Sequence, residues 1–143
     1  MYLRKRIETG FPNSLVGVML LVVLCTAPTF AEGYKYECRV TNRYSFGNAF
    51  TKEEIEKGRF SIMVEDYETG WYISRCTFSP EKNQDVCIRY RMDAYEYDRR
   101  RHIRKYFIKN PQYQFQMFNS LSFVEDDSIG ITQYGRCLLI EQD

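Results

Sequence analysis

Apolar and polar residues alternate along several stretches of the chain. In Tyr113–Met117 every second residue is apolar, and glutamines stand between them. Residues 60–65 follow the same rule, with Phe60, Ile62 and Val64 in one set, and a longer alternating run covers residues 86–94. A period of two places one set on each face of a strand. These stretches therefore predict β-strands with one face in a core and one in water.

Turn signals separate the apolar runs. Asp66–Gly70 predicts a hairpin in which Gly70 takes a positive φ. Asn110-Pro111 and residues 126–128 separate later runs, and Gly135 leads into the last one. Between these turns, the predicted strands are Tyr34–Thr41, Phe60–Glu65, Trp71–Phe78, Ile103–Lys109, Gln112–Phe118, Leu121–Val124, Ile129–Tyr134 and Arg136–Ile140. About seven or eight strands joined by short turns predict a mostly β fold, either an antiparallel sandwich or a small barrel.

One short helix interrupts the strands. Thr51 and Glu54 match a capping box, in which each side chain satisfies a backbone N–H at the start of a helix. Gly58 stands where a C-terminal glycine belongs. A helix of about two turns is not stable alone, so we expect Ile55 and Phe50 to pack it on the sheet.

The first 31 residues have the zones of a signal peptide. A cationic start at residues 4–6 precedes the apolar stretch Leu15–Leu24, and small residues, Thr29 and Ala31, stand before Glu32. A bilayer span needs roughly 20 apolar residues, whereas this core offers about 10. The sequence thus predicts a cleaved signal peptide over 1–31 and a single β domain over 32–143.

A lipid-modified Cys25 is the alternative for the leader. Such sites prefer Gly, Ala or Ser before the cysteine, and Leu24 stands there instead. Cleavage before Glu32 therefore remains the favoured interpretation, and it predicts a periplasmic or secreted protein without a membrane attachment.

Charge narrows the class of partner. The chain has 20 Lys and Arg against 19 Asp and Glu, and loss of three bases and one acid with the leader leaves 17 against 18. A nearly neutral domain has no general electrostatic attraction to nucleic acid or to a membrane surface. We therefore expect a protein partner, no specific nucleic acid and no membrane, with the oligomeric state left open.

Four cysteines remain after cleavage, and an even number in an oxidising compartment is typical of disulfides. Of three possible pairings we favour Cys38 with Cys137, which ties the ends of the domain, and Cys76 with Cys87, which closes a turn region. A zinc site would need closely spaced ligands. The chain has no Cys-x-x-Cys pair and only one histidine, so no metal is predicted.

A basic run is the most unusual local feature, and its members, a possible binding surface, are Arg99, Arg100, Arg101, His102, Arg104 and Lys105. Such a cluster can bind an acidic protein face or a polyanion. The simpler interpretation is a solvated connection leading into the strand at Ile103, neutralised by Asp93, Glu96 and Asp98.

Catalytic interpretations rest on residue types alone. A ribonuclease could use His102 as its acid and Glu96 or Glu125 as its base, and a glycosidase could draw on Glu65, Asp66 and Glu68. The acidic residues 125–127 lack the spacing of a calcium loop and indicate an exposed turn.

Trp71, beside Tyr72, fits core packing better than a ligand patch. Nucleophile-elbow, zinc-protease, phosphate-loop and dinucleotide motifs are absent from the sequence. The leading hypothesis is thus a non-enzymatic binding domain without a cofactor.

Short motifs resemble two groups of exported proteins. Tyr36-x-Cys38, the stretch from Trp71 to Ser79, Lys105-Tyr106-Phe107 and the ending Tyr134-Gly135-Arg136-Cys137 together resemble small exported alphaproteobacterial proteins of unknown function. The Tyr-x-Cys opening and late cysteine are also similar to periplasmic inhibitors of c-type lysozyme, which are small β-barrels. Their inhibitory Ser-Ala-Ser-Gly-x-Tyr loop has no counterpart here, so no inhibitory residue is carried over.

Overall fold

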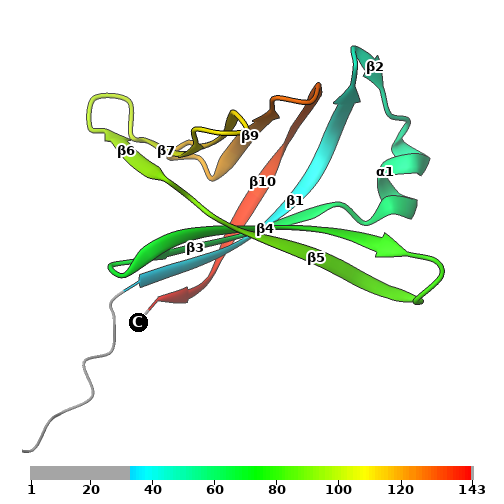
Figure 1. The fold of residues 1–143 in the computed structure, drawn as a ribbon, viewed down its shortest axis with the longest axis horizontal. Helices are drawn as coiled ribbons and strands as arrows, with labels where there is room; N and C mark the ends of the chain where they lie inside the picture. The colour runs from blue at the N-terminus through cyan, green and yellow to red at the C-terminus, as the bar shows by residue number, and fades with distance from the viewer. Residues whose placement is uncertain (1–32, 143) are drawn as a thin grey trace, which may run out of the picture.

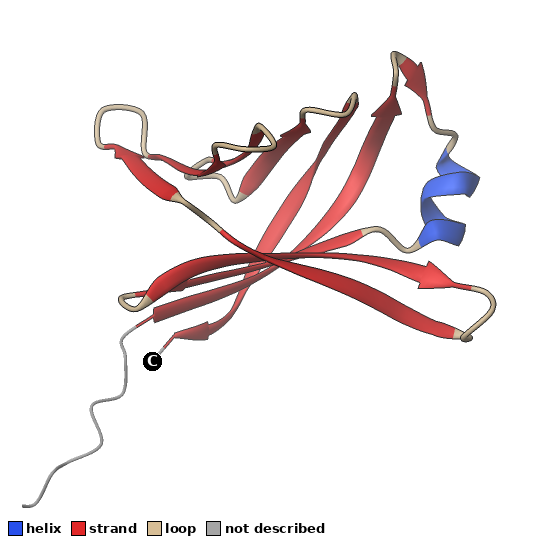
Figure 2. Cartoon of the chain, in the orientation of Figure 1, coloured by secondary structure: helices blue, strands red, loops and turns tan. Residues whose placement is uncertain are grey.

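The computed structural model describes residues 33–142. Strands make up most of this part of the chain, and one short helix lies at the side (Figure 2). The elements are β1 (Gly33–Ser45), β2 (Asn48–Ala49), α1 (Lys52–Gly58), β3 (Ser61–Tyr67), β4 (Gly70–Ser79), β5 (Gln84–Arg91), β6 (Ala94–Asp98), β7 (Ile103–Ile108), β8 (Tyr113–Met117), β9 (Ser122–Asp127) and β10 (Ile131–Gln142). The predicted mostly β class is confirmed.

The strands form one antiparallel sheet. Its order is β5-β4-β3-β1-β10-β9-β8-β7-β6, and β2 pairs with β1 outside this path. The long strands β1 and β10 lie at the centre, and the two halves of the sheet diverge from them (Figure 1). The result is an open half-barrel, in agreement with the predicted barrel-like or sandwich-like fold.

β5 and β6 form the two opposite edges of the sheet and do not pair with each other, so the sheet stays open. Residues 86–94, which the alternation predicts as one run, break at Met92 and Asp93. The Met92 N–H donates to the Trp71 carbonyl at 2.9 Å, and the Asp93 N–H donates to the Phe107 carbonyl at 2.8 Å. Consecutive amides thus bind opposite halves of the sheet, so the prediction of a continuous run was wrong.

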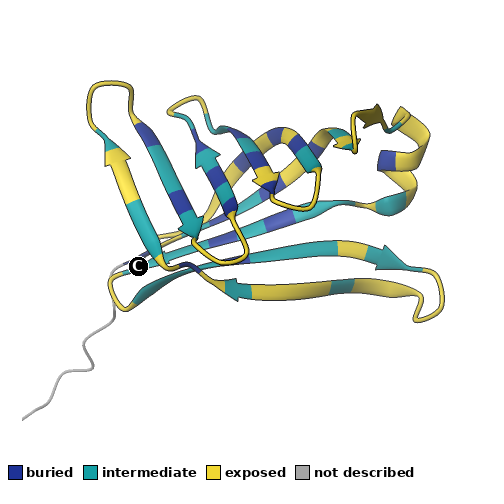
Figure 3. Ribbon diagram, turned by 45° about the horizontal axis from the view of Figure 1, so that its top comes forward, coloured by how far each residue is buried: buried dark blue, intermediate teal, exposed yellow. Residues whose placement is uncertain are grey.

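The concave face carries the core. The largest fully buried side chains include Tyr106, Phe115, Phe123, Ile62, Ile73 and Met117. Burial alternates with partial exposure along β3, β8 and β9, as the coloured bands in Figure 3 illustrate. Each such side chain contributes about 1.5–3 kcal/mol when it leaves water. Two groups of polar side chains share the concave face with this apolar centre, one around Asp66 and Arg104 and one around Arg75 and Glu125.

Gly135 lies inside β10, so the predicted separation of Ile129–Tyr134 from Arg136–Ile140 was wrong. A Cβ at Gly135 would lie 1.8 Å from the carbonyl oxygen of Arg39. The glycine therefore permits close approach of β1 and β10, next to the register shift between Val40 and Asn42. The predicted hairpin before β4 is confirmed, and Gly70 has φ +152°.

Helix α1 forms as its capping box predicts. The Thr51 hydroxyl accepts from the Glu54 N–H at 3.2 Å, and the Glu54 carboxylate accepts from the Thr51 N–H at 2.7 Å. Ile55 is buried, and Phe50 contacts Phe60 edge to face. The helix ends one residue later than predicted, because the left-handed position belongs to Arg59 with φ +47°.

Both favoured disulfides are present. Cys38 bonds to Cys137 across β1 and β10, and Cys76 bonds to Cys87 across β4 and β5. Paired cysteines of this kind indicate an oxidising compartment. The predicted signal peptide and Cys25 lie outside the described residues. Between residues 33 and 142, no helix has the length and apolar character needed to cross a membrane.

Candidate functional site

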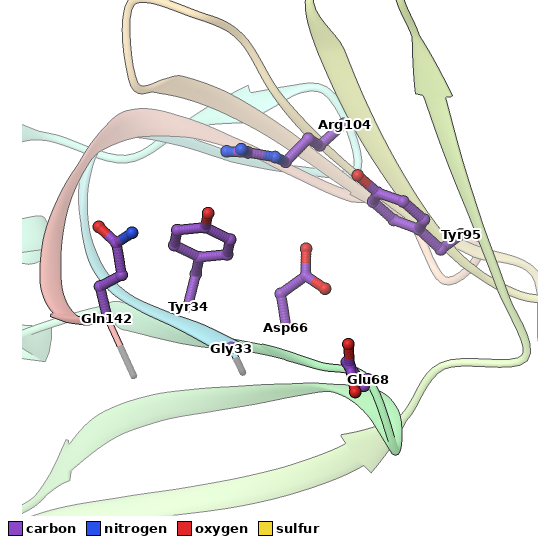
Figure 4. Close-up of a pocket in the computed structure, with 7 residues that line it drawn as sticks. All are labelled: Gly33, Tyr34, Asp66, Glu68, Tyr95, Arg104 and Gln142. Carbon is purple, nitrogen blue, oxygen red and sulfur yellow. The ribbon is translucent and has the colours of Figure 1, made fainter. Parts of the chain in front are cut away.

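A pocket of about 400 Å³ opens between the start of β1, the β3–β4 hairpin and the strands β6 and β7. We call it the Tyr–Arg pocket, and it is lined by Gly33, Tyr34, Asp66, Glu68, Tyr95, Arg104 and Gln142. Figure 4 shows the hydroxyls of Tyr34 and Tyr95, the carboxylate of Asp66 and the guanidinium of Arg104 directed into one space. Charged groups of both signs therefore meet here.

Strand register explains one wall of the pocket. Tyr34 on β1 pairs with Asp66 on β3, and Asp66 pairs with Trp71 on β4. Cross-strand partners project on the same face of a sheet, so these three side chains form a row. Glu65 points to the other face, where it binds Arg89 at 2.8 Å.

The opposite wall is a second row. Tyr95 on β6 pairs with Tyr106 on β7. Tyr106 donates to the Asp66 carboxylate at 2.8 Å, and the Tyr95 ring stacks on Trp71 with centroids 5.4 Å apart. These two contacts join the halves of the sheet beside the pocket. Trp71 thus packs against the core, as expected, and also supports Tyr95.

Arg104 is held by neutral groups. Its guanidinium donates to the Tyr36 hydroxyl at 2.9 Å and interacts electrostatically with the Tyr95 side chain. Burial raises the pKa of Tyr36, Tyr95 and Tyr106, so all three phenols stay protonated at neutral pH. Although burial lowers the pKa of Arg104, the neighbouring tyrosines raise it above its usual value.

The cation of Arg104 has no ion pair among residues 33–142. Asp66 faces the same pocket and binds Tyr106, while Glu68 lies at the exposed hairpin turn. The pocket therefore offers one half-buried cation and two carboxylates that are not neutralised by it. Such a dipolar arrangement suits a ligand with charges of both signs.

The basic run divides into different environments. Arg99, Arg100 and Arg101 lie in the exposed turn between β6 and β7, where Asp98 accepts from the backbone N–H groups of Arg100 and Arg101. Lys105 pairs in register with Glu96. The structure does not bring all six residues onto one face, because strand alternation turns Arg104 into the pocket. Binding at the basic run stays a prediction.

His102 stands apart from the proposed bases of a ribonuclease. Its Nδ1 hydrogen-bonds to the Tyr97 hydroxyl at 2.9 Å, in an exposed turn where His102 has φ +53°. Glu125 is fully buried and bonded to other residues. Glu96 lies opposite Lys105 in the register of β6 and β7. The structure therefore does not bring His102 and Glu125 together.

The acidic residues 125–127 do not form an exposed turn. Asp126 is exposed, but Glu125 and Asp127 point inward from β9 and lie 3.0 Å and 3.1 Å from the guanidinium of Arg75. Tyr113 donates to Glu125 at 2.6 Å, and Gln133 donates to its other oxygen. The prediction was wrong because the alternation of β9 continues through Asp127.

The members of this buried carboxylate network (Arg75, Tyr113, Glu125, Asp127, Gln133) contact one another, although Oδ2 of Asp127, which lies 3.1 Å from Arg75, has no hydrogen-bond partner. Burial raises the pKa of Glu125, although the charge of Arg75 acts in the opposite direction. Within the described part of the chain, no three His, Cys, Asp or Glu side chains cluster closely enough to hold a metal ion. The network connects β4 with β8, β9 and β10 inside the half-barrel.

No protein-family model, curated protein or solved structure matches the chain. The resemblances to exported alphaproteobacterial proteins and to lysozyme inhibitors therefore stay predictions.

Sequence reasoning missed Tyr34, Tyr95 and Gln142 as pocket residues. It named Asp66 and Glu68 as candidate carboxylates of a glycosidase, and it named Arg104 separately as a cation of the basic run. Only the order of the strands brings β3 beside β1 and turns β7 toward them. The usable signal was the spacing of Arg104 and Tyr106, which share a face.

Proposed function

We propose that the protein is an exported, non-enzymatic binding protein, periplasmic or secreted, whose Tyr–Arg pocket holds a polypeptide partner. An acidic group of the partner binds Arg104, and a basic group binds Asp66 and Glu68. The observation that carries the proposal is the half-buried guanidinium of Arg104, which neutral tyrosines hold in an open pocket without an ion pair among residues 33–142.

Partial loss of water around Arg104 favours the binding of an acidic group. A charged group that loses water needs compensation by hydrogen bonds or by an opposite charge. Tyrosine hydroxyls supply only part of it for Arg104, so an incoming carboxylate gains charge-assisted hydrogen bonds with a guanidinium already fixed in place. Tyr34 and Tyr95 add aromatic surface for the aliphatic parts of the ligand.

Exposed apolar side chains on β10, the strand that also carries Gln142 of the pocket, favour a polypeptide over a small molecule. Leu138, Leu139 and Ile140 are consecutive on β10 and are 67%, 44% and 48% exposed. The register shift between Lys35 and Tyr36 in the β1–β10 pairing accompanies this loss of alternation. Exposed apolar patches with a charged neighbour are typical of protein interfaces.

Export is supported by the predicted signal peptide together with the two disulfides. The mass of the protein recovered from its own cells, before and after reduction, tests this part. Cleavage before Glu32 and a gain of four hydrogens on reduction are expected. A chain that begins at Met1 with free thiols would overturn it.

Site-specific photo-crosslinking tests the binding surface. Tyr34 and Tyr44 lie on the same strand and are equally exposed, at 38% and 37%, but only Tyr34 lines the pocket. With p-benzoylphenylalanine at position 34, we expect a discrete protein adduct in the organism's own cells. The same probe at position 44 should give none.

The adduct at position 34 should also disappear when Arg104→Gln is added, whereas Arg99→Gln should leave it unchanged. An adduct that ignores Arg104→Gln, or equal adducts at both positions, would contradict the proposal. The hydrolase alternative has its own assay, turnover of RNA and peptidoglycan. Activity that His102→Ala abolishes would replace binding with catalysis as the function.

A further inference from the structure

We infer that β5 is an interface at which two copies of this chain pair edge to edge across a two-fold axis. This inference is independent of the Tyr–Arg pocket, because β5 contributes no residue to that pocket. Within residues 33–142, β5 pairs with β4 alone, so its second backbone edge has no strand beside it. Such an edge is a template for another strand.

The β4–β5 register fixes which backbone groups are free. Cys76 and Cys87 face each other with Cα atoms 4.0 Å apart. This spacing is typical of a non-hydrogen-bonded pair, whereas hydrogen-bonded pairs are wider. Val86 and Ile88 therefore bond to β4. The N–H and C=O groups of Asp85, Cys87, Arg89 and Arg91 point away from it, toward the free edge.

The side chains of β5 are complementary to themselves when the strand is reversed. An antiparallel partner whose Ile88 faces the first Ile88 also brings Val86 opposite Tyr90 on the concave side. Ile88 is 58% exposed, so this contact buries apolar surface that the single chain leaves in water. The same register brings Asp85 opposite Arg91 twice, once on each side of the axis.

Charge complementarity selects this register over its neighbours. Within the described residues Arg91 has no ion pair, whereas Arg89 already binds Glu65 at 2.8 Å. A register shifted by two would offer Asp85 to Arg89 and leave Arg91 beyond the opposing strand. Asp85 binds Arg59 through Oδ2, so Oδ1 is the oxygen that Arg91 of the second copy would bind. Charges on an edge usually discourage pairing, but here opposite signs meet under two-fold symmetry.

A charge-swap experiment tests the interface. The native protein should sediment as a concentration-dependent dimer in analytical ultracentrifugation. Asp85→Arg alone brings like charges together, as does Arg91→Asp alone, so each should weaken the dimer at least about tenfold. A mixture of the two variants restores both opposite-charge contacts and should form a heterodimer.

Circular dichroism and thermal melting check that both variants are folded. Because the two substitutions lie on the surface, we expect both variants to melt near the native temperature. Arg99→Asp, an exposed change in the β6–β7 turn, is the matched control and should leave the dimer unchanged. A native protein that is monomeric at all concentrations would overturn the inference. So would variants that dimerise as well alone as in the mixture. None of these outcomes bears on crosslinking at Tyr34.

Discussion

The guanidinium of Arg75 lies 3.0 Å from the carboxylate of Glu125, and together they join the two halves of the half-barrel from inside. Arg75 belongs to β4 and Glu125 to β9, which are separated in the sheet by β3, β1 and β10. The ion pair therefore bridges the opening that no strand closes. It shares this role with the hydrogen bond between Tyr106 and Asp66 beside the Tyr–Arg pocket.

Replacement of Arg75 by methionine should lower the free energy of unfolding by about 3–5 kcal/mol, because it leaves two buried carboxylates without their cation. Arg89→Met is the matched control, since its pair with Glu65 lies nearer the surface and should cost no more than about 1 kcal/mol. Urea unfolding measures both. Equal losses would show that the buried network does not hold the half-barrel together.

Two glutamates should give opposite dependences of stability on pH. Burial raises the pKa of Glu125 above its value in the unfolded chain. At pH values between the unfolded and the folded pKa, the folded state therefore binds more protons than the unfolded state. The contribution of Glu125 is therefore present below the unfolded pKa and is lost as pH rises through the folded one. Hydrogen bonds from Thr51 lower the pKa of Glu54, so its contribution is lost as pH falls.

Thermal melts between pH 3 and pH 8 test this prediction. Glu125→Gln should remove the part of the profile that declines toward higher pH, and Glu54→Gln should flatten the decline toward lower pH. If both variants changed the profile in the same direction, the assignment of Glu125 as a carboxyl with a raised pKa would be wrong.

Gly135→Ala should destabilise the protein by about 1–3 kcal/mol or more, because the added Cβ meets a backbone oxygen of Arg39 that cannot rotate away. Gly47→Ala is the control, since nothing lies within 4 Å of a Cβ there and its φ of +82° adds only backbone strain, worth about 1 kcal/mol. Differential scanning calorimetry compares the two. Similar melting temperatures would contradict the close crossing of β1 and β10.

The two disulfides should contribute unequally. Their cysteines are 99 and 11 residues apart, and chain entropy then assigns about 4.7 and about 2.8 kcal/mol to them. The Cys38→Ala/Cys137→Ala variant should therefore unfold at lower denaturant than the Cys76→Ala/Cys87→Ala variant. The reverse order would mean that the turn bridge, not the bridge between the ends, stabilises the domain.

Local patterns predicted much of the fold. Alternation identified most strands, the pair Thr51 and Glu54 identified the helix, and loop lengths favoured the disulfide pairing that the structure contains. The failures lie where tertiary structure decides. An alternating run carries no sign that Met92 and Asp93 bind opposite halves of a sheet, and a glycine such as Gly135 looks the same in a turn and in a crowded strand.

The candidate site was less predictable for a related reason. Arg104 stands in a run of bases, and composition alone assigned it to the surface with its neighbours. Its direction depends on the register of β7, and its neutral surroundings depend on tyrosines from β1 and β6. Glu125 and Asp127 were misplaced in the same way, since their cation comes from β4.

The central claim is that Arg104 is a cation ready to accept the acidic group of a ligand. Nuclear magnetic resonance of the arginine Nε–H groups tests it most directly. The titrants are the peptides acetyl-Lys-Glu-amide, which carries one base and one acid, and acetyl-Lys-Gln-amide, which lacks the acid. We predict a saturable shift of the Arg104 signal with the first peptide only, while exposed Arg99 stays unchanged. An Arg104 signal that does not move, or that moves no more than that of Arg99, would contradict the account.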